Sequence, residues 1–178
     1  ADYLLASDNE IEPVSGQAGL CPAGVPEKHY DISAIDVEIT LNRWLDYYVG
    51  YMYVLTENID KVREEEEANA AAREKEGYDP GAVETGLQNN WIQPLVIRGN
   101  QGDCVRFTLR NQLITGEGAS LQIGGSSMMV SATGQPATTT NSDAIALEDK
   151  VVEMEWYIPP TMQEGGRQFH SYSNDREL

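Results

Sequence analysis

The chain has 178 residues, which is enough for one domain with a substantial core. Twelve lysines and arginines stand against 29 acidic residues, so the formal net charge is -17, and this charge repels nucleic-acid phosphates and anionic membrane surfaces. No apolar run approaches the roughly 20 residues that span a bilayer. We therefore expect no nucleic-acid binding and no membrane insertion.

Residues 1–29 are rich in glycine, proline and acidic side chains. This composition is typical of an extended N-terminal arm on the surface. The chain begins at Ala1 rather than at a methionine, as it would after removal of a signal peptide, although a recombinant chain would begin in the same way. We expect a secreted protein, extracellular or periplasmic.

The chain contains two cysteines, Cys21 and Cys104. An even count in a secreted chain predicts one disulfide, here between the arm and the domain. Two free buried thiols are the alternative. A cysteine-ligated metal site is the weakest hypothesis, because the two residues lie far apart and show no CxxC spacing.

The domain is predicted to span residues 30–178 and to begin with two strands. Residues 30–41 alternate in polarity, which predicts a strand with one buried face. The expected apolar face consists of Ile35, Val37, Ile39 and Leu41. Residues 47–55 form a second apolar and aromatic run, in which Gly50 marks a bend or bulge.

Residues 57–76 consist of strong helix formers between a predicted N-cap at Thr56 and a stop at Gly77. We expect one acidic α-helix here, as part of an insertion over residues 56–90. After Ile59 and Val62 its only apolar side chains are alanines. The helix is therefore expected to dock weakly at its start and to stand in water elsewhere.

Four consecutive glutamates occupy residues 64–67 of this helix. Adjacent side chains fan around a helix axis instead of converging. We interpret them as a solvated face and not as a metal site.

The rest of the sequence predicts strands, because short β-prone runs are separated by turn residues. These runs cover residues 92–98, 104–113, 119–123, 128–132, 151–158 and 167–170. The polar segment at residues 133–143 is predicted as a loop. The pattern predicts an all-β sandwich or barrel with one inserted helix.

Three segments carry a family resemblance: HYDISAIDVEITLNRW, then IQPLVIRGNQGDCVRFTLRNQL, then ASLQIGG with the later WYIPPTMQEGGRQFHSYSND. In this order they resemble the N-terminal cupredoxin domain of large secreted multicopper oxidases, including manganese-oxidase-like and ceruloplasmin-like proteins. The second segment is the most specific, since its turn at Gly102 and Asp103 matches the family's I-x-V-x-x-G-D-x-V hairpin. The resemblance implies a cupredoxin-like Greek-key β-sandwich.

Most of the histidines that hold copper in that family are missing here. The resemblance places Gln122 where one ligand histidine would stand, whereas the later motif keeps His170 and puts Tyr172 in place of a second. The chain contains only His29 and His170, and an amide is a poor substitute for imidazole toward copper. A blue-copper site is also not expected, because Cys104 has no neighbouring histidine.

Copper is therefore expected only in a complete assembly, with none bound by this chain alone. His170 is the one metal-ligand prediction, as a ligand shared with another chain or domain. The alternative for His170 is a hydrogen-bonded histidine at the end of a strand. For His29 we expect no functional role.

Two further groups are predicted to pack instead of binding a ligand. Met128 and Met129 could ligate Cu(I), but adjacent residues of a strand face opposite ways. A cluster of aromatic side chains could form a sugar-stacking or electron-hopping surface, although core and cross-strand packing is the preferred interpretation. These aromatics are Trp44, Tyr47, Tyr48, Tyr51 and Tyr53.

The resembling family continues into one more strand, whereas this chain ends at Leu178. We expect the sandwich to lack its last strand, which another polypeptide would supply: the C-terminal remainder of the same precursor or a neighbouring subunit.

Two functions are compatible with these expectations. The first is an N-terminal domain or fragment of a secreted multicopper-oxidase-like protein. In this case the chain is largely copper-free, structural and inactive alone, and a partner chain or domain oxidises metal ions or small phenols. The alternative is a non-catalytic extracellular module, a cell-surface or filament subunit, on the same fold.

Overall fold

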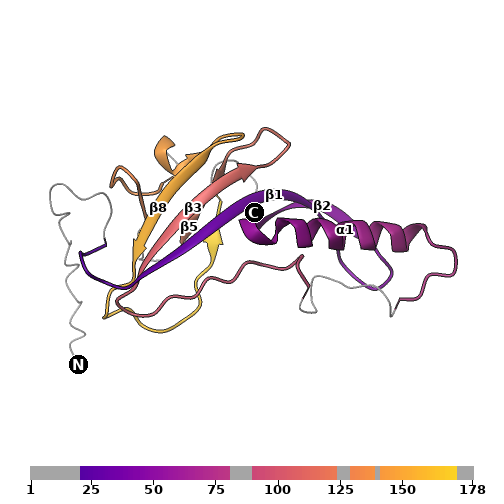
Figure 1. Cartoon of the computed structure of the whole chain (residues 1–178), viewed down its shortest axis with the longest axis horizontal. Helices are drawn as coiled ribbons and strands as arrows, with labels where there is room; N and C mark the ends of the chain where they lie inside the picture. Colours follow the sequence, from indigo (N-terminus) through magenta and orange to yellow (C-terminus); the bar gives the residue numbers. More distant parts are fainter. Residues whose placement is uncertain (1–20, 81–89, 124–128, 139–140, 172–178) are drawn as a thin grey trace, which may run out of the picture.

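The computed structural model describes residues 21–80, 90–123, 129–138 and 141–171 (Figure 1). Within these residues the chain is rich in strands and carries one α-helix. The helix and the longer strands are β1 (Glu27–Thr40), β2 (Tyr47–Leu55), α1 (Ile59–Glu74), β3 (Cys104–Gln112) and β8 (Val151–Tyr157). The short elements are the 3₁₀ turns η1 (Thr56–Asn58) and η2 (Ser142–Ala144), and the strands β4 (Ala119–Ser120), β5 (Gln122–Ile123), β6 (Val130–Ser131), β7 (Ile145–Ala146) and β9 (Phe169–His170).

Five strands form a mixed main sheet in the order β2-β1-β3-β8-β6. β1 and β3 run parallel, and the other neighbours are antiparallel. The strand predicted over residues 104–113 is confirmed as β3, in which Val105, Phe107 and Leu109 are buried in one apolar cluster. In the part of the chain that the structure describes, the prediction of a β-rich fold with one helix is thus confirmed.

A second, much smaller layer faces the main sheet. It contains two ladders of two strands each, β4–β7 and β5–β9. Apolar side chains from both layers form one cluster, the main core, in which Phe107 of the main sheet packs edge-on against Phe169 of β9. Within the described residues the arrangement resembles a sandwich in which the main sheet faces a fragmentary layer, formed by these two ladders.

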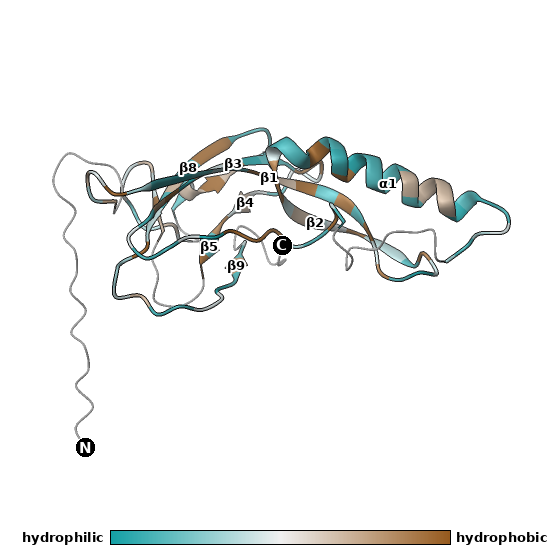
Figure 2. Ribbon diagram, turned by 60° about the horizontal axis from the view of Figure 1, so that its bottom comes forward, coloured by the Kyte–Doolittle hydropathy of each residue, from teal (hydrophilic) through white to brown (hydrophobic). Residues whose placement is uncertain are grey.

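β1 is buried on both faces, so the expectation of a single buried face is wrong. Ile32 and Ala34 belong to the main core. Ile35 and Val37 point to the outer face of the main sheet, where α1 covers them (Figure 2). The outer cluster consists of Ile35, Val37, Met52, Val54, Val62 and Ile92.

α1 confirms the prediction of one helix, but it docks more firmly than expected. The carboxylate of Glu65 is buried and accepts hydrogen bonds from the backbone N–H groups of Trp91 at 2.6 Å and Ile92 at 3.1 Å. Glu66 accepts from the backbone N–H of Glu38 at 2.6 Å. The interpretation of residues 64–67 as a solvated face therefore fails for Glu65 and Glu66, because polar side chains replace the missing apolar face of the helix.

Residues 92–98 do not form the predicted strand. The segment is extended and alternates in burial, with Leu95 and Ile97 packed against the main core and Val96 70% exposed. Its backbone joins no ladder among the described residues. The polarity pattern predicted the packing correctly, but a strand also needs a paired neighbour.

The expectation that the aromatic cluster is buried is only partly correct. Tyr53 lies in the main core, whereas Trp44 is 70% exposed and Tyr47 and Tyr48 are each half exposed. The end of the β1–β2 hairpin extends beyond β3, since β3 pairs with β1 only as far as Ile35. No third strand covers the aromatics there among the described residues.

The remaining predictions concern shorter elements. The structure divides the predicted strand 119–123 into β4 and β5, and it reduces 128–132 to β6 and 167–170 to β9. Met129 is buried in the main core as expected, while Met128 lies outside the described residues.

Candidate functional site

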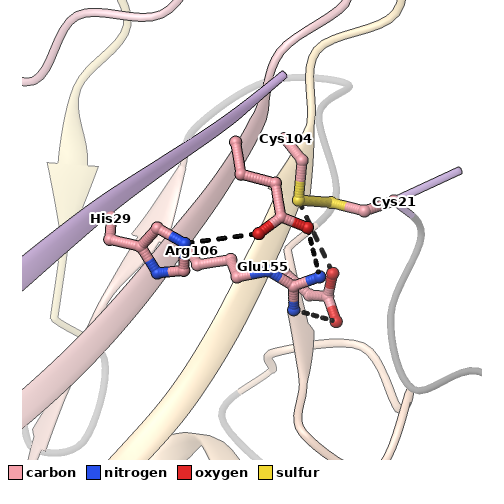
Figure 3. The surroundings of a disulfide bond; sticks show 6 residues. Cys21, His29, Cys104, Arg106 and Glu155 are labelled. Carbon is pink, nitrogen blue, oxygen red and sulfur yellow. Dashed lines mark hydrogen bonds and ion pairs between the residues drawn. A yellow bond between two sulfur atoms is a disulfide. The ribbon is translucent and has the colours of Figure 1, made fainter. Parts of the chain in front are cut away.

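The predicted disulfide is confirmed: Cys21 and Cys104 are bonded, with their Cα atoms 5.5 Å apart. Cys104 begins β3 and lies on the outer face of the main sheet. The bond fixes the segment that precedes β1 to the strand beside it (Figure 3). Neither cysteine is free to act as a thiol ligand or nucleophile.

A charged cluster surrounds this disulfide. Arg106 lies on β3 between Glu27 of β1 and Glu155 of β8, with N···O distances of 3.1 and 3.3 Å. His29 contacts the other oxygen of Glu27 at 3.3 Å. The sheet register produces this row, since Arg106 is directly opposite His29 on one side and Glu155 on the other.

Glu155 is the most deeply buried charge of this cluster, at 4% exposure. One of its carboxylate oxygens lies 3.7 Å from the sulfur of Cys104. Burial raises the pKa of Glu155, an effect that Arg106 opposes and Glu27 reinforces. Conversely, Arg106 holds the pKa of the exposed Glu27 carboxyl below its ordinary value.

The disulfide cluster does not fit a metal ion. The sulfurs of Cys21 and Cys104 and a carboxylate oxygen of Glu155 lie within 4.8 Å of one another. However, both sulfurs are held in the disulfide, and metal binding by cysteine requires a thiolate. The other carboxylate oxygen of Glu155 is paired with Arg106. We assign this cluster a structural role.

The sheet register brings together two of the residues that the family resemblance singled out. Gln122 on β5 stands directly opposite His170 on β9. Side chains of directly opposed residues share one face of an antiparallel pair. Their neighbours Ile123 and Phe169 pack in or against the main core, so Gln122 and His170 point away from it. Tyr172 lies outside the described residues.

A hollow of about 680 Å³ adjoins this pair. Its walls come from the end of β1, from β2, from the segment 92–97 and from residues 167–170. Mostly apolar and aromatic side chains line it, with Arg167 and His170 among the polar ones. Its lining thus combines residues at the β2 edge of the main sheet with residues of the fragmentary layer and of the segment 92–97.

Tyr53 anchors the fragmentary layer beside the hollow. Its hydroxyl donates to the backbone oxygen of Ser120, and the backbone N–H of Ser120 donates to the Ser171 hydroxyl at 3.2 Å. Burial raises the pKa of Tyr53, so this phenol stays protonated and serves as a donor.

Sequence reasoning missed Glu155 and Arg167. Glu155 is one of two glutamates in an alternating strand, and the alternation gives both the pattern of a solvated face. Only the register with Arg106 and the position of the disulfide distinguish it from Glu153. For Arg167 no sequence signal marks a place beside a hollow.

Among the described residues no helix combines the length and the apolarity needed to cross a membrane. No protein-family model matches the sequence. A search of curated proteins also returned no match.

Proposed function

We propose that this chain is a structural, cupredoxin-like unit of a larger secreted assembly related to multicopper oxidases, in which a partner chain or domain oxidises metal ions or small phenols. The observation that carries the proposal is the placement of the only two histidines. His29 lies on β1 beside Glu27, and His170 lies on β9 opposite Gln122. They belong to different layers and cannot form an imidazole pair.

The residues around His170 do not fit a copper centre formed by this chain. A multinuclear centre needs several imidazoles, and a blue-copper site needs two histidines and a cysteine thiolate. Here one imidazole has an amide as its cross-strand neighbour, and the sulfur of Cys104 is in a disulfide. Any copper in the assembly would have to take most of its ligands from elsewhere, with His170 contributing at most one.

Two features support the finer assignment of a Greek-key cupredoxin fold. The layers enclose one main core, as in a sandwich. The turn that carries the family resemblance also has the expected geometry: Gly102 has φ +87°, in the left-handed region that glycine tolerates best, and Asp103 accepts a hydrogen bond from the backbone N–H of Asn100 at 2.7 Å.

The disulfide supports the proposed secretion, because such bonds persist mainly in oxidising compartments. The alternative function, a cell-surface or filament subunit without any oxidase, makes the same demands on this chain. The two functions differ only in what the partner carries.

Metal analysis of the native material tests the proposal. We expect no stoichiometric copper and no oxidase activity for the purified chain by itself. Several copper ions in the assembly with its partner would support the oxidase, whereas a copper-free assembly would support the structural module. Stoichiometric copper with oxidase activity in the chain alone would contradict the proposal, and His170→Ala would then show whether His170 holds that copper.

A further inference from the structure

A buried carboxyl group contacts the sulfur of Cys104. Both Glu155 and Cys104 are buried, and Oε2 of Glu155 lies 3.7 Å from Sγ of Cys104. A dashed line marks this contact in Figure 3. The structural role of the disulfide cluster uses the other carboxylate oxygen, which pairs with Arg106. If the disulfide opened, Oε2 would be the acceptor for a thiol at Cys104.

The two sulfurs of the disulfide differ in their accessibility. Cys104 is fully buried, whereas Cys21 is partly exposed and is followed by the exposed residues 22–24. Disulfides open when a thiolate attacks one of the two sulfurs, and access decides which sulfur is attacked. Attack at Cys21 leaves the electron pair of the broken bond on Cys104. The buried sulfur is thus the leaving group.

A thiolate at Cys104 would be unfavourable in these surroundings. Burial disfavours the charged form of a thiol, and an ionised Glu155 would repel it. Arg106 already pairs with Glu27 and Glu155, and β6 places only the apolar Val130 opposite Glu155. The sulfur therefore needs a proton as the bond breaks. Burial raises the pKa of Glu155, which favours the protonated form that can supply it.

We propose that the disulfide cluster is an exchange site for a dithiol carrier, in which Glu155 transfers a proton to Cys104 when the bond opens and takes it back when the bond forms. In the first step a carrier thiolate attacks Sγ of Cys21. The S–S bond breaks, and its electron pair stays on Sγ of Cys104, which takes the proton of the Glu155 carboxyl.

In the second step the other carrier sulfur, as a thiolate, displaces Cys21 from the mixed disulfide. Cys21 and Glu155 then take protons from water. The carrier leaves oxidised, and the chain has gained two thiols. Formation of the bond follows the same steps in reverse, with the Glu155 carboxylate as the base for Cys104. This inference does not depend on the proposed function, since it requires only a thiol carrier.

Reduction of the native chain by dithiothreitol tests the proton transfer. Rates are measured from about pH 5 to about pH 9 and divided by the fraction of dithiothreitol that is a thiolate. We expect the corrected rate constant to be level at low pH and to fall about tenfold per pH unit once Glu155 is ionised. A corrected rate constant that is level over the whole range would overturn the proposal.

Glu155→Gln separates transfer of the proton from the effect of the charge. Glutamine has a similar shape and no charge, but its amide does not give up a proton in this range. We expect a corrected rate constant that is level with pH and at least about tenfold below the low-pH value of the unchanged protein. A level value equal to that low-pH value would mean that only the charge of Glu155 matters, and would refute the proton transfer.

The matched controls remove the other titratable side chains on this face near Glu155. They are His29 on β1 and Glu153 and Tyr157 on β8, and the strand register places all three on the face that carries Arg106. His29→Gln, Glu153→Gln and Tyr157→Phe should each keep the pH profile of the unchanged protein. If one of them removed the fall at high pH, that side chain and not Glu155 would be the proton donor.

A monothiol identifies the sulfur that is attacked. Glutathione forms a mixed disulfide with the native chain, rapid alkylation blocks the released thiol, and peptide mapping locates both groups. We expect glutathione on Cys21 and the alkyl group on Cys104, and the reverse labelling would contradict the proposed direction of attack. In about 1 M urea the reduction rate should change less than about twofold. An acceleration of about fivefold or more would show that the chain must unfold before it is reduced, and the proposal would then be wrong.

Discussion

The outer face of β1 is stabilised at its two ends in different ways. At the first end the disulfide lies beside Glu27, and Glu27 pairs with Arg106 and contacts His29, while Glu27 and His29 both stay exposed. At the other end α1 covers Ile35 and Val37. Figure 1 shows the helix on the far side of the molecule from the segment that precedes β1.

The interactions at the two ends of β1 also differ in whether they change the free energy of the unfolded chain or of the folded chain. A disulfide stabilises mainly by restricting the unfolded chain. The hydrogen bonds that the Glu65 carboxylate accepts from the backbone N–H groups of Trp91 and Ile92 exist only in the folded chain. Between the two ends, Asp31 and Arg110 form a bidentate ion pair with two N···O distances of 2.8 Å. β1 is thus stabilised at its start by a disulfide and at its end by a helix whose glutamate side chains accept hydrogen bonds from the backbone.

Removal of the disulfide is expected to give the largest effect. The bond joins residues 83 positions apart, and the loop-closure relation then gives about 4.5 kcal/mol. The double variant Cys21→Ala and Cys104→Ala should lose about this much free energy of unfolding in a denaturant titration. A loss below about 1 kcal/mol would show that the disulfide end is held mainly by its ion pairs and by packing.

Glu65→Ala is expected to give the second-largest loss of stability, at the end of β1 that α1 covers. It removes the acceptor of two backbone N–H groups, one of them in a fully buried hydrogen bond. Leaving these groups unpaired should cost about 2–3 kcal/mol of unfolding free energy. The matched control is Glu64→Ala, which changes an exposed glutamate of the same helix. Equal losses in the two variants would mean that the hydrogen bonds accepted by Glu65 contribute nothing to the free energy of unfolding.

The smallest expected effect is a change of the unfolding free energy with pH, which arises from Glu155 beside the disulfide. Because burial raises the pKa of Glu155, the folded chain keeps this proton to a higher pH than the unfolded chain does. The free energy of unfolding should therefore fall as pH rises from the ordinary value of 4.5 through the raised pKa. In Glu155→Gln this part of the slope should disappear.

Glu153→Gln is the control for that titration, since Glu153 is exposed on the same strand. If both variants kept the slope of the unchanged protein, Glu155 would not titrate in this range. Comparing Glu155→Gln with Glu153→Gln therefore separates the contribution of one buried carboxyl from the general effect of a very acidic surface.

Local patterns in the sequence predicted the long elements well. The alternation of β3, the helix at residues 57–76 and the pairing of the two cysteines all depend on short-range composition or on counting. The double burial of β1 could not be predicted in the same way, because it depends on α1 returning to cover Ile35. The prediction of a strand at residues 92–98 was wrong for a related reason. The polarity pattern indicates which side chains are buried, but it does not indicate whether the backbone has a partner strand.

The arrangement of the candidate sites could likewise not be predicted from local sequence. The positions of Gln122 and His170 came from a resemblance, and only the register of β5 and β9 places them opposite each other. The environment of Glu155 depends on three strands and a disulfide. No local pattern contains such an arrangement.

The parallel pairing of β1 with β3 also has a consequence for the order of folding. Every residue pair in that ladder is separated by the same long stretch of chain, which includes β2 and α1. Contacts between distant residues form slowly, because the loop must close before any of them is gained. The bond between Cys21 and Cys104 lies at the first rung of this ladder, next to Glu27. Once formed, the bond holds this rung together, so a chain that unfolds with the bond intact need not close the long loop again before β1 and β3 pair.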